Sequence, residues 1–401
     1  MKQTLAVLAA MTLSLPALHA QTAAKPFNMY FIDTEGGLSA LYVSPSGESM
    51  LLDTGNPGDR DLNRILDVLK EADVKQIDYM VITHYHVDHV GGFKALYEKI
   101  PMKHFIDHGE DRDTREQVQG FYAWYTDMTQ KAGAGARTIA KPGDRIPIKG
   151  LNVEVLTADG KVLKKPIAGA PGAGKPNPAC ADYKQQAPNT DLDNAASLAL
   201  VMQYGKFRTV NMGDFVYNEE GDLMCPNNPV GTIDLYLTSH HGTDQSGSAA
   251  LVHALQPRVA VMHNGQRKGG AIPVYKVLYS SPGLEDLWQL HYALGAGPEY
   301  NTPGIYIANI EDPVALGNYL ANPAPARGPG GGRGFSGGGR GPGGGSGRGG
   351  GGGFGGGRGG GPIAPHNSGP AYYIKVSAMP DGSFTVTNTR NNFSKTYAAK
   401  K

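Results

Sequence analysis

Cysteine and net charge are both scarce in this sequence of 401 residues. The two cysteines, Cys180 and Cys225, do not fall in a short ligand spacing, which argues against a metal site built on cysteine. They are compatible with one disulfide in an oxidising compartment or with two free buried thiols. The 37 basic and 36 acidic side chains almost cancel, so total charge does not indicate a polyanion or a membrane surface as a partner.

A membrane-length apolar run is also missing. The apolar stretch over residues 5–15 follows Lys2 and precedes the small-residue segment 16–20. This order is typical of a secretory signal peptide, which we predict over residues 1–20. The stretch is shorter than the roughly 20 residues of a spanning helix, so we expect no stable membrane span. The sequence therefore predicts an exported protein, periplasmic or extracellular. The residue directly after Ala20 is not a cysteine, so we expect no lipid anchor at the cleavage site.

Acidic residues are absent from a glycine-rich tract near the C-terminus, residues 324–361. Its charged side chains are five arginines, at positions 327, 333, 340, 348 and 358. This composition cannot form a core and predicts a flexible cationic segment. The arginines are sparse, which favours a passive linker over a tract that holds nucleic acid or another anionic polymer. Beyond it, residues 362–401 are predicted to form a β-hairpin packed on the main domain.

The rest of the chain alternates apolar runs with helical periods. The expected strands are 27–32, 38–43, 49–53, 77–82, 103–107, 195–203, 207–212, 234–238 and 258–262. The expected helices are 59–73, 93–99, 246–255, 273–280 and 284–291. Residues 161–189, rich in Pro, Ala, Gly and Lys, are expected to form a long surface loop.

Four potential metal ligands stand within six residues, in the motif His84-Tyr85-His86-Val87-Asp88-His89. The motif follows the apolar run 77–82 and precedes a Gly-Gly pair, a strand, loop and helix-start context. His84 and His86, two residues apart, can point the same way, while Asp88 and His89 can address a second ion. Surface histidines that cluster by chance are the alternative, and the context argues against it.

Two later segments offer the remaining ligands. Asp214 follows an expected strand, and its carboxylate can hold two cations about 3.5 to 4 Å apart. His240, in the segment His240-His241-Gly242 after another strand, can complete the second site. Gly213-Asp214 alone would be an ordinary turn. The order of the three segments along the chain makes the combined signal strong.

These three segments resemble the metallo-β-lactamase fold superfamily, and more finely its branch of ComEC-type competence domains and phosphorylcholine esterases. Residues 31–37 and 51–55 resemble the opening strands of that branch. The resemblance covers roughly residues 27–310 and implies a four-layer α/β fold, an αββα sandwich with two mixed β-sheets. We therefore assign residues 27–323 to one catalytic domain.

The resemblance implies a ligand set for two divalent metal ions. His84 and His86 would bind the first ion, Asp88 and His89 the second, Asp214 would bridge them, and His240 would complete the second site. One departure from the wider superfamily is that a third histidine for the first ion is not evident, and Asp193-Asn194 stands near its place. The first site is thus expected to be weaker or more open. Zn²⁺ is the default, with Mn²⁺ or Fe as alternatives.

The function expected from the resemblance is hydrolysis of a phosphodiester or related ester by a metal-bridging hydroxide. Asp88 would both ligate and orient this nucleophile, and His241 would contact a leaving group or merely pack. Asp53 and Thr83 are candidates for support of the ligands, and His108 for a substrate contact. β-Lactamase or lactonase activity is the alternative within enzymes. An anionic-polymer-binding protein with a vestigial metal site is the alternative of another class.

Overall fold

The computed structural model describes residues 24–188, 190–310 and 371–400. The predicted signal peptide and the glycine-rich tract both lie outside these ranges. Within them, no helix combines the length and the apolar character that a membrane crossing needs.

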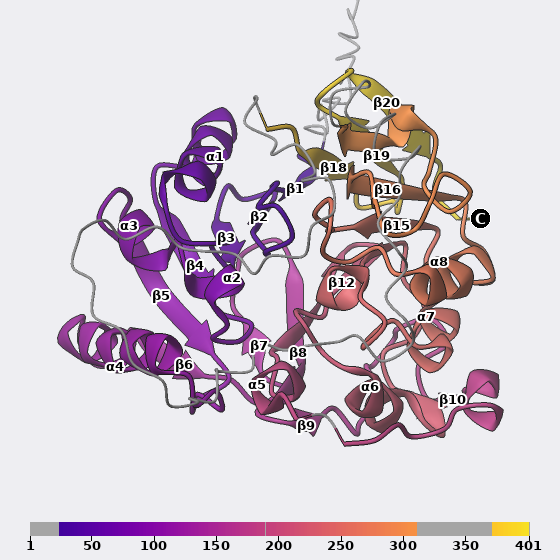
Figure 1. Cartoon of the computed structure of the whole chain (residues 1–401), viewed down its shortest axis with the longest axis horizontal. Helices are drawn as coiled ribbons and strands as arrows, with labels where there is room; N and C mark the ends of the chain where they lie inside the picture. The colour runs from indigo at the N-terminus through magenta and orange to yellow at the C-terminus, as the bar shows by residue number, and fades with distance from the viewer. Residues whose placement is uncertain (1–23, 189, 311–370, 401) are drawn as a thin grey trace, which may run out of the picture.

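Two large mixed sheets form the body of the molecule (Figure 1). The first has the order β20-β19-β18-β1-β2-β3-β4-β5-β6, antiparallel up to the β2–β3 pair and parallel from β3 to β6. Its strands are β1 (Phe27–Phe31), β2 (Ala40–Val43), β3 (Ser49–Leu52), β4 (Ile77–Val81), β5 (Met102–Asp107), β6 (Arg137–Ile139), β18 (Ile374–Ala378), β19 (Phe384–Asn388) and β20 (Phe393–Tyr397).

The second sheet has the order β17-β16-β15-β14-β12-β11-β8-β7, with β9 paired to β8. It is parallel from β12 to β17 and antiparallel elsewhere. Its strands are β7 (Arg145–Ile146), β8 (Asn152–Ala158), β9 (Lys161–Val162), β11 (Ala199–Tyr204), β12 (Phe207–Asn211), β14 (Leu235–Leu237), β15 (Val259–Met262), β16 (Asp286–His291) and β17 (Ile307–Asn309). A separate two-stranded ribbon joins β10 (Lys175–Pro176) to β13 (Asn227–Asn228).

Helices cover the outer face of each sheet. The helices of the described residues are α1 (Asp59–Glu71), α2 (Val87–Val90), α3 (Phe93–Tyr97), α4 (Glu116–Lys131), α5 (Leu192–Ala195), α6 (Tyr217–Met224), α7 (Ala249–Leu255) and α8 (Ile272–Tyr279), with the 3₁₀ turns η1 (Pro178–Ala181), η2 (Ser239–Gly242) and η3 (Gly304–Tyr306). Figure 1 shows α1, α3 and α4 on the side of the first sheet and α6, α7 and α8 on the side of the second.

The period of the strands explains the layers. In β1, Phe27, Met29 and Phe31 belong to the core between the sheets, whereas Tyr30 belongs to the core under α1 and α4. Successive side chains of a strand point to opposite faces, so each sheet has two apolar faces to bury. One core lies between the sheets and one lies under the helices of each outer layer. The expected fold with two mixed sheets is confirmed.

One expected helix is wrong. Residues 284–291 were predicted to be helical, but residues 286–291 form strand β16, which lies between β15 and β17 and pairs in parallel with both. Every residue of β16 except Asp286 is buried, so its apolar run lacks the alternation of a half-exposed strand. A short, fully buried strand cannot be told from a helix by periodicity alone.

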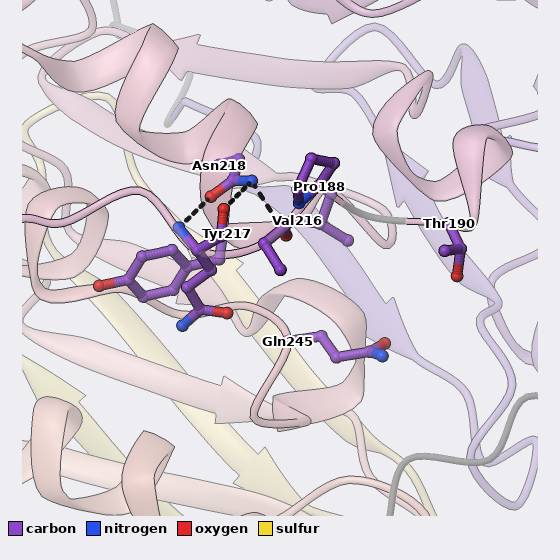
Figure 2. A pocket seen from close by; sticks show the side chains of 8 residues that line it. Pro188, Thr190, Val216, Tyr217, Asn218 and Gln245 are labelled. Atoms are coloured by element: carbon purple, nitrogen blue, oxygen red, sulfur yellow. Dashed lines mark hydrogen bonds between the residues drawn. The ribbon is translucent and has the colours of Figure 1, made fainter. Parts of the chain in front are cut away.

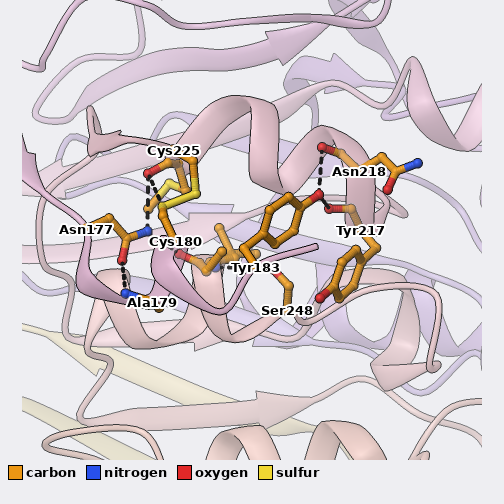
Figure 3. Close-up of a disulfide and its surroundings, with 11 residues drawn as sticks. Asn177, Ala179, Cys180, Tyr183, Tyr217, Asn218, Cys225 and Ser248 are labelled. Carbon is orange, nitrogen blue, oxygen red and sulfur yellow. Dashed lines mark hydrogen bonds between the residues drawn. A yellow bond between two sulfur atoms is a disulfide. The ribbon is translucent and has the colours of Figure 1, made fainter. Parts of the chain in front are cut away.

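The segment 161–189, predicted to be a long loop, is held to the second sheet's outer layer. Residues 161–188 contain β9, β10 and η1 and are otherwise irregular. A disulfide joins Cys180 in η1 to Cys225 at the end of α6, which decides between the two states that the sequence left open (Figure 3). Tyr183 adds to this attachment, since its hydroxyl donates to the carbonyl of Tyr217 at 3.0 Å.

Candidate metal centre

The predicted ligands meet where strands from both sheets end. His84, His86, Asp88 and His89 follow β4 of the first sheet, Asp214 follows β12 of the second, and His240 and His241 lie in η2 after β14. Backbone hydrogen bonds join these segments: Leu198 N donates to Thr83 O at 2.8 Å, and His240 N donates to Gly213 O at 2.9 Å. The carboxyl ends of parallel strands thus converge on one site.

Four of the side chains form a compact cluster, Asp88, His89, Asp214 and His241, whose ligand atoms all lie within 4.8 Å of one another. The Nε2 atoms of His89 and His241 are each 3.3 Å from Asp214 Oδ1 and 3.5 Å from Asp88 Oδ2. Two carboxylates and two imidazoles around one point are a donor set that suits Zn²⁺ and other first-row divalent ions.

Asp214 presents its two oxygens to two different groups. Oδ1 faces His89 and His241, whereas Oδ2 lies 3.4 Å from His240 Nε2 and 3.9 Å from His84 Nε2. The carboxylate is buried and could therefore contact one ion through each oxygen. Burial would raise the pKa of Asp214, but the surrounding histidines, with His241 the strongest, hold it well below its usual range.

Four inner atoms of the centre are without hydrogen-bond partners among the described residues. These atoms are the Nε2 atoms of His84, His89 and His241, and Oδ1 of Asp214, all buried. The outer nitrogens are occupied, because His89 Nδ1 contacts Asp53 Oδ2 at 2.7 Å and His241 Nδ1 contacts the carbonyl of His263 at 3.2 Å. Buried polar atoms are rarely left unpaired. Imidazole rings that are hydrogen-bonded through Nδ1 and leave Nε2 unpaired are oriented as the histidine ligands of a metal centre are.

Asp53 anchors the back of the centre. It adopts a left-handed backbone conformation at φ 57° directly after β3, and it accepts hydrogen bonds from Thr83 N at 2.8 Å and Thr83 Oγ1 at 2.5 Å. Burial raises the pKa of Asp53. Burial acts oppositely on His89, but the carboxylates of Asp214, Asp88 and Asp53 prevail and raise the pKa of His89 to about 10. Asp53 and Thr83 therefore lie where the sequence placed the supporting residues.

His86 faces carboxylates that the sequence did not single out. Its Nε2 lies 3.0 Å from Asp191 Oδ1 and 3.5 Å from Asp113 Oδ2, while its ring centroid is 4.5 Å from that of His84. With Nε2 turned toward Asp191, Nδ1 is the nitrogen that remains for an ion. Burial would lower the pKa of His86, but the hydrogen bond and charge of Asp191 raise it.

Asp193, near the place of the missing third histidine, has a structural position. Its carboxylate accepts hydrogen bonds from Tyr85 N at 2.6 Å and Arg112 N at 3.0 Å, and it lies 3.5 Å from His108 Nε2. His108 is buried against Tyr85, with ring centroids 4.9 Å apart. Through these hydrogen bonds Asp193 connects the loop after β4, which contains Tyr85, to the segment after β5, which contains Arg112.

His240 and His241 differ in placement from the expectation. The sequence placed His240 with Asp88 and His89, but the structure brings His241 there and sets His240 beside the other oxygen of Asp214. Both histidines adopt left-handed backbone conformations, at φ 48° and 57°. Two successive left-handed residues reverse the chain after β14, so alternation along an extended chain does not predict which ring faces inward.

Two other buried histidines, His263 and His291, lie outside the ligand cluster and contact protein groups. His263 provides the carbonyl that supports His241, and its buried ring has a pKa lowered by burial to about 3. His291 Nε2 contacts Asp33 Oδ1 at 2.7 Å, and Arg64 contacts the other oxygen of Asp33 at 2.9 Å. Asp33, Glu35 and His291 form a second group with metal-ligand geometry. Arg64 contacts both Asp33 and Glu35, at 2.9 and 3.5 Å, so an ion pair network accounts for this group.

Lys268 is a functional candidate that the sequence reasoning missed. It lies in the loop between β15 and α8, and its ammonium group contacts Asp88 Oδ2. Burial would raise the pKa of Asp88, but Lys268 and the histidines at 89 and 241 hold it well below its usual range. The loop is marked in the sequence by three glycines between residues 265 and 270, but no local signal pairs it with the motif.

A cavity of about 210 Å³ is lined in part by residues that lie next in sequence to those of the centre (Figure 2). Its lining is uncharged: Gln186, Ala187, Pro188, Thr190, Val216, Tyr217, Asn218 and Gln245. Thr190 precedes Asp191 in the chain and Val216 lies two residues after Asp214, so the cavity and the centre share segments. The Asn218 amide holds the backbone of residue 186, because Gln186 N donates to Asn218 Oδ1 at 2.8 Å.

The disulfide and Tyr183 attach the segment that leads to this cavity (Figure 3). The Tyr183 ring stacks on Tyr217 with centroids 5.2 Å apart. Gly221 in α6 permits this approach, since a Cβ there would lie 2.2 Å from the Tyr183 ring. The segment from Cys180 to Thr190 is therefore fixed at the disulfide and at Tyr183 before it reaches the cavity.

Comparison with known proteins gives a family for this arrangement. Residues 33–174 match the model described as the Metallo-beta-lactamase superfamily. The Beta-lactamase-like protein 2 homolog of Caenorhabditis elegans is 32% identical over 110 residues, which are 27% of this chain and 37% of that protein. ComE operon protein 3 of Bacillus subtilis is 24% identical over 220 residues, covering 53% of this chain and 23% of that protein.

Recombination protein 2 of Haemophilus influenzae is 22% identical over 250 residues, which are 62% of this chain and 25% of that protein. The chain thus spans well under two thirds of the length of these curated relatives. Among solved structures, the metallo-beta-lactamase fold protein YhfI from Bacillus subtilis aligns at 13% identity with a TM-score of 0.39, over 66% of this chain and 96% of that one. CmlA, a diiron beta-hydroxylase from Streptomyces venezuelae, aligns at 13% identity with a TM-score of 0.32, over 60% of this chain and 45% of that one.

The family match covers the whole His84 to His89 motif. The matches to ComE operon protein 3 and Recombination protein 2 support the ComEC-like branch. Together with the clustered histidines and carboxylates, the family implies divalent metals and suggests a metal-dependent hydrolase. The chain carries a domain of the metallo-beta-lactamase superfamily.

Proposed function

We propose that this chain is an exported binuclear metal-dependent hydrolase that cleaves a phosphodiester or a related ester. The observation that carries the proposal is the set of buried, unpaired inner atoms on His84, His89, His241 and Asp214. Export rests on the signal-like residues 1–20 and agrees with the disulfide, since disulfides persist in oxidising compartments.

Each of the two ions would have ligands of its own, and both would share the carboxylate of Asp214. Asp88, His89 and His241 would hold the second ion, and Asp214 would contribute one oxygen to each. His84 Nε2 and His86 Nδ1 would hold the first ion. When bound, two divalent ions supply a water that is deprotonated near neutral pH and positive charge for the reacting phosphoryl or carbonyl group. Zn²⁺ is the default for this donor set, with Mn²⁺ or Fe next.

The protein residues orient the ligands and the substrate. Asp53 fixes His89 through Nδ1, and the His263 carbonyl fixes His241 in the same way. Asp88 would orient the nucleophile, and the 3.5 Å contacts of its Oδ2 with His89 and His241 support this role. The position of His241 favours a role in holding metal over a contact with a leaving group. The uncharged cavity favours a neutral polar group on the substrate.

Metal content and turnover of three variants test the proposal. The wild-type chain should bind about two divalent ions and hydrolyse bis(p-nitrophenyl) phosphate. Asp214→Asn should lose ions from both positions and at least about 100-fold in turnover. His241→Ala should lose the second ion only. His104→Ala removes an exposed histidine, stacked on Tyr79, and should behave as wild type.

The outcome against the proposal is an Asp214→Asn protein that is folded, metal-loaded and active. A panel with a phosphodiester, a lactone and a β-lactam, assayed at equal metal loading, then separates the phosphoesterase from the lactonase or β-lactamase alternative. Turnover of the lactam or lactone alone would overturn the substrate class and keep the metal centre.

A further inference from the structure

The loop that carries Lys268 is rigidly seated against the centre. Gly265 N donates to Lys268 O at 3.0 Å and closes a turn, and Gly270 N donates to His241 O at 3.3 Å. A Cβ on Gly269 would lie 1.9 Å from His241 O, so the loop backbone presses on the residue that completes the second site. The backbone of Lys268 is therefore fixed, and its side chain is the part that can move.

The opposite side of Lys268 is shaped by the first sheet. A Cβ on Gly36 would lie 3.0 Å from Lys268 Cβ, and a Cβ on Gly37 would lie 2.4 Å from the Asp88 carbonyl. Leu38 N donates to that same carbonyl at 3.1 Å. The Glu35-Gly36-Gly37 turn thus lets the Lys268 stem and the Asp88 backbone approach each other, which sets the ammonium group at the rim of the centre.

The ammonium group contacts Asp88 Oδ2, the oxygen that also faces His89 and His241. The Lys268 side chain is 39% exposed, whereas that of Asp88 is 18% exposed, so the lysine enters from the solvent side. An ion held by Asp88 would neutralise this carboxylate and leave the ammonium group in need of another anion. A long lysine side chain can turn to one without any backbone shift.

We propose that Lys268 binds an anionic oxygen of the substrate beside the second ion, and so makes the site selective for anionic phosphodiesters over neutral esters and lactones. The inference rests on the proposed function and names its substrate class. Lys268 acts as a charge-specific binding residue, because a lysine ammonium group is a point charge suited to phosphate oxygens. The uncharged cavity beside Thr190 and Val216 is left for the neutral part of the substrate.

The test uses the full-length metal-loaded protein and the variants Lys268→Met and Lys268→Arg. Inorganic phosphate is titrated by calorimetry, and kcat/KM is measured for bis(p-nitrophenyl) phosphate and for neutral p-nitrophenyl acetate. Lys268→Met should weaken phosphate binding and lower kcat/KM for the diester about 10- to 100-fold, mainly through KM. It should lower kcat/KM for the acetate far less than for the diester, with the metal content retained, and Lys268→Arg should restore most of the diester activity.

Lys276→Met is the matched control, since Lys276 is exposed on α8 and its loss removes the same charge at a distance from Asp88. Equal losses on both substrates, or loss of metal from Lys268→Met, would overturn the proposal and leave Lys268 as a support for Asp88. If the wild type cleaves neither substrate, the proposed hydrolysis fails by itself. The phosphate titration still decides the role of Lys268 in that case, and unchanged phosphate affinity in Lys268→Met overturns it.

Discussion

Removal of the Cys180–Cys225 disulfide should destabilise the protein and loosen one wall of the cavity. The two cysteines are 45 residues apart, and the chain-entropy relation for a loop of that length gives about 4 kcal/mol. This segment keeps other attachments without the disulfide. Asn177 Nδ2 donates to Met224 O at 3.1 Å and to Ala250 O at 2.8 Å, and Tyr183 stays bonded to Tyr217. The double variant should therefore fold, with a lower free energy of unfolding.

The measurement is urea unfolding of the wild type, the wild type with reductant, and the Cys180→Ser/Cys225→Ser variant. We expect the last two to agree with each other and to lie about 2 to 4 kcal/mol below the oxidised wild type. Since the segment from Cys180 leads to Thr190 in the cavity wall, KM for a substrate that fills the cavity should rise with little change in metal content.

A result that refutes this reasoning is an unfolding midpoint that reductant leaves unchanged while free-thiol titration shows two reduced cysteines. The loop would then be held by its other contacts, and closure of the 45-residue loop would contribute nothing to stability. An unchanged midpoint with no free thiols would mean only that the bond resisted reduction, and the double variant decides that case.

Three further predictions concern the centre, the ion pair network and the tract. Asp53→Ala should weaken metal binding about 10- to 100-fold, because His89 loses the carboxylate that orients it; metal titration measures this. Asp33→Asn should destabilise the protein by about 3 kcal/mol at neutral pH, by breaking a buried pair with His291. Burial would raise the pKa of Asp33, but His291 and Arg64 lower it below its ordinary value of 3.8. The stability that the Asp33 carboxylate contributes is therefore present above that pH and is lost as the pH falls further. Urea unfolding at several pH values should show the free energies of unfolding of the wild type and of Asp33→Asn converging in acid. Deletion of residues 328–361 should leave kcat/KM on a small diester unchanged, and a large loss would place the tract in the active machinery.

The strands around the motif were predictable because their residues carry a local pattern. The runs at 27–32, 49–53 and 77–82 contain β1, β3 and β4, and helix α1 follows from the period of Leu62 and Ile65, both buried. Strand β16 was missed because burial on both faces removes alternation. The C-terminal hairpin expected within residues 362–401 corresponds to β18 and β19, and β20 was not foreseen because Phe393–Tyr397 is a mixed-polarity edge strand.

The sequence by itself determined which residues could hold metal. The spacing of His84, His86, Asp88 and His89 puts four ligands on one turn after a strand, and covalent spacing is a local property that needs no fold. Only the tertiary structure decided how they are completed. Two left-handed residues select His241 over His240 for the cluster, and a glycine-rich loop 180 residues away in the chain brings Lys268 to Asp88. Contacts of that kind depend on how the two sheets pack, and no short stretch of sequence records them.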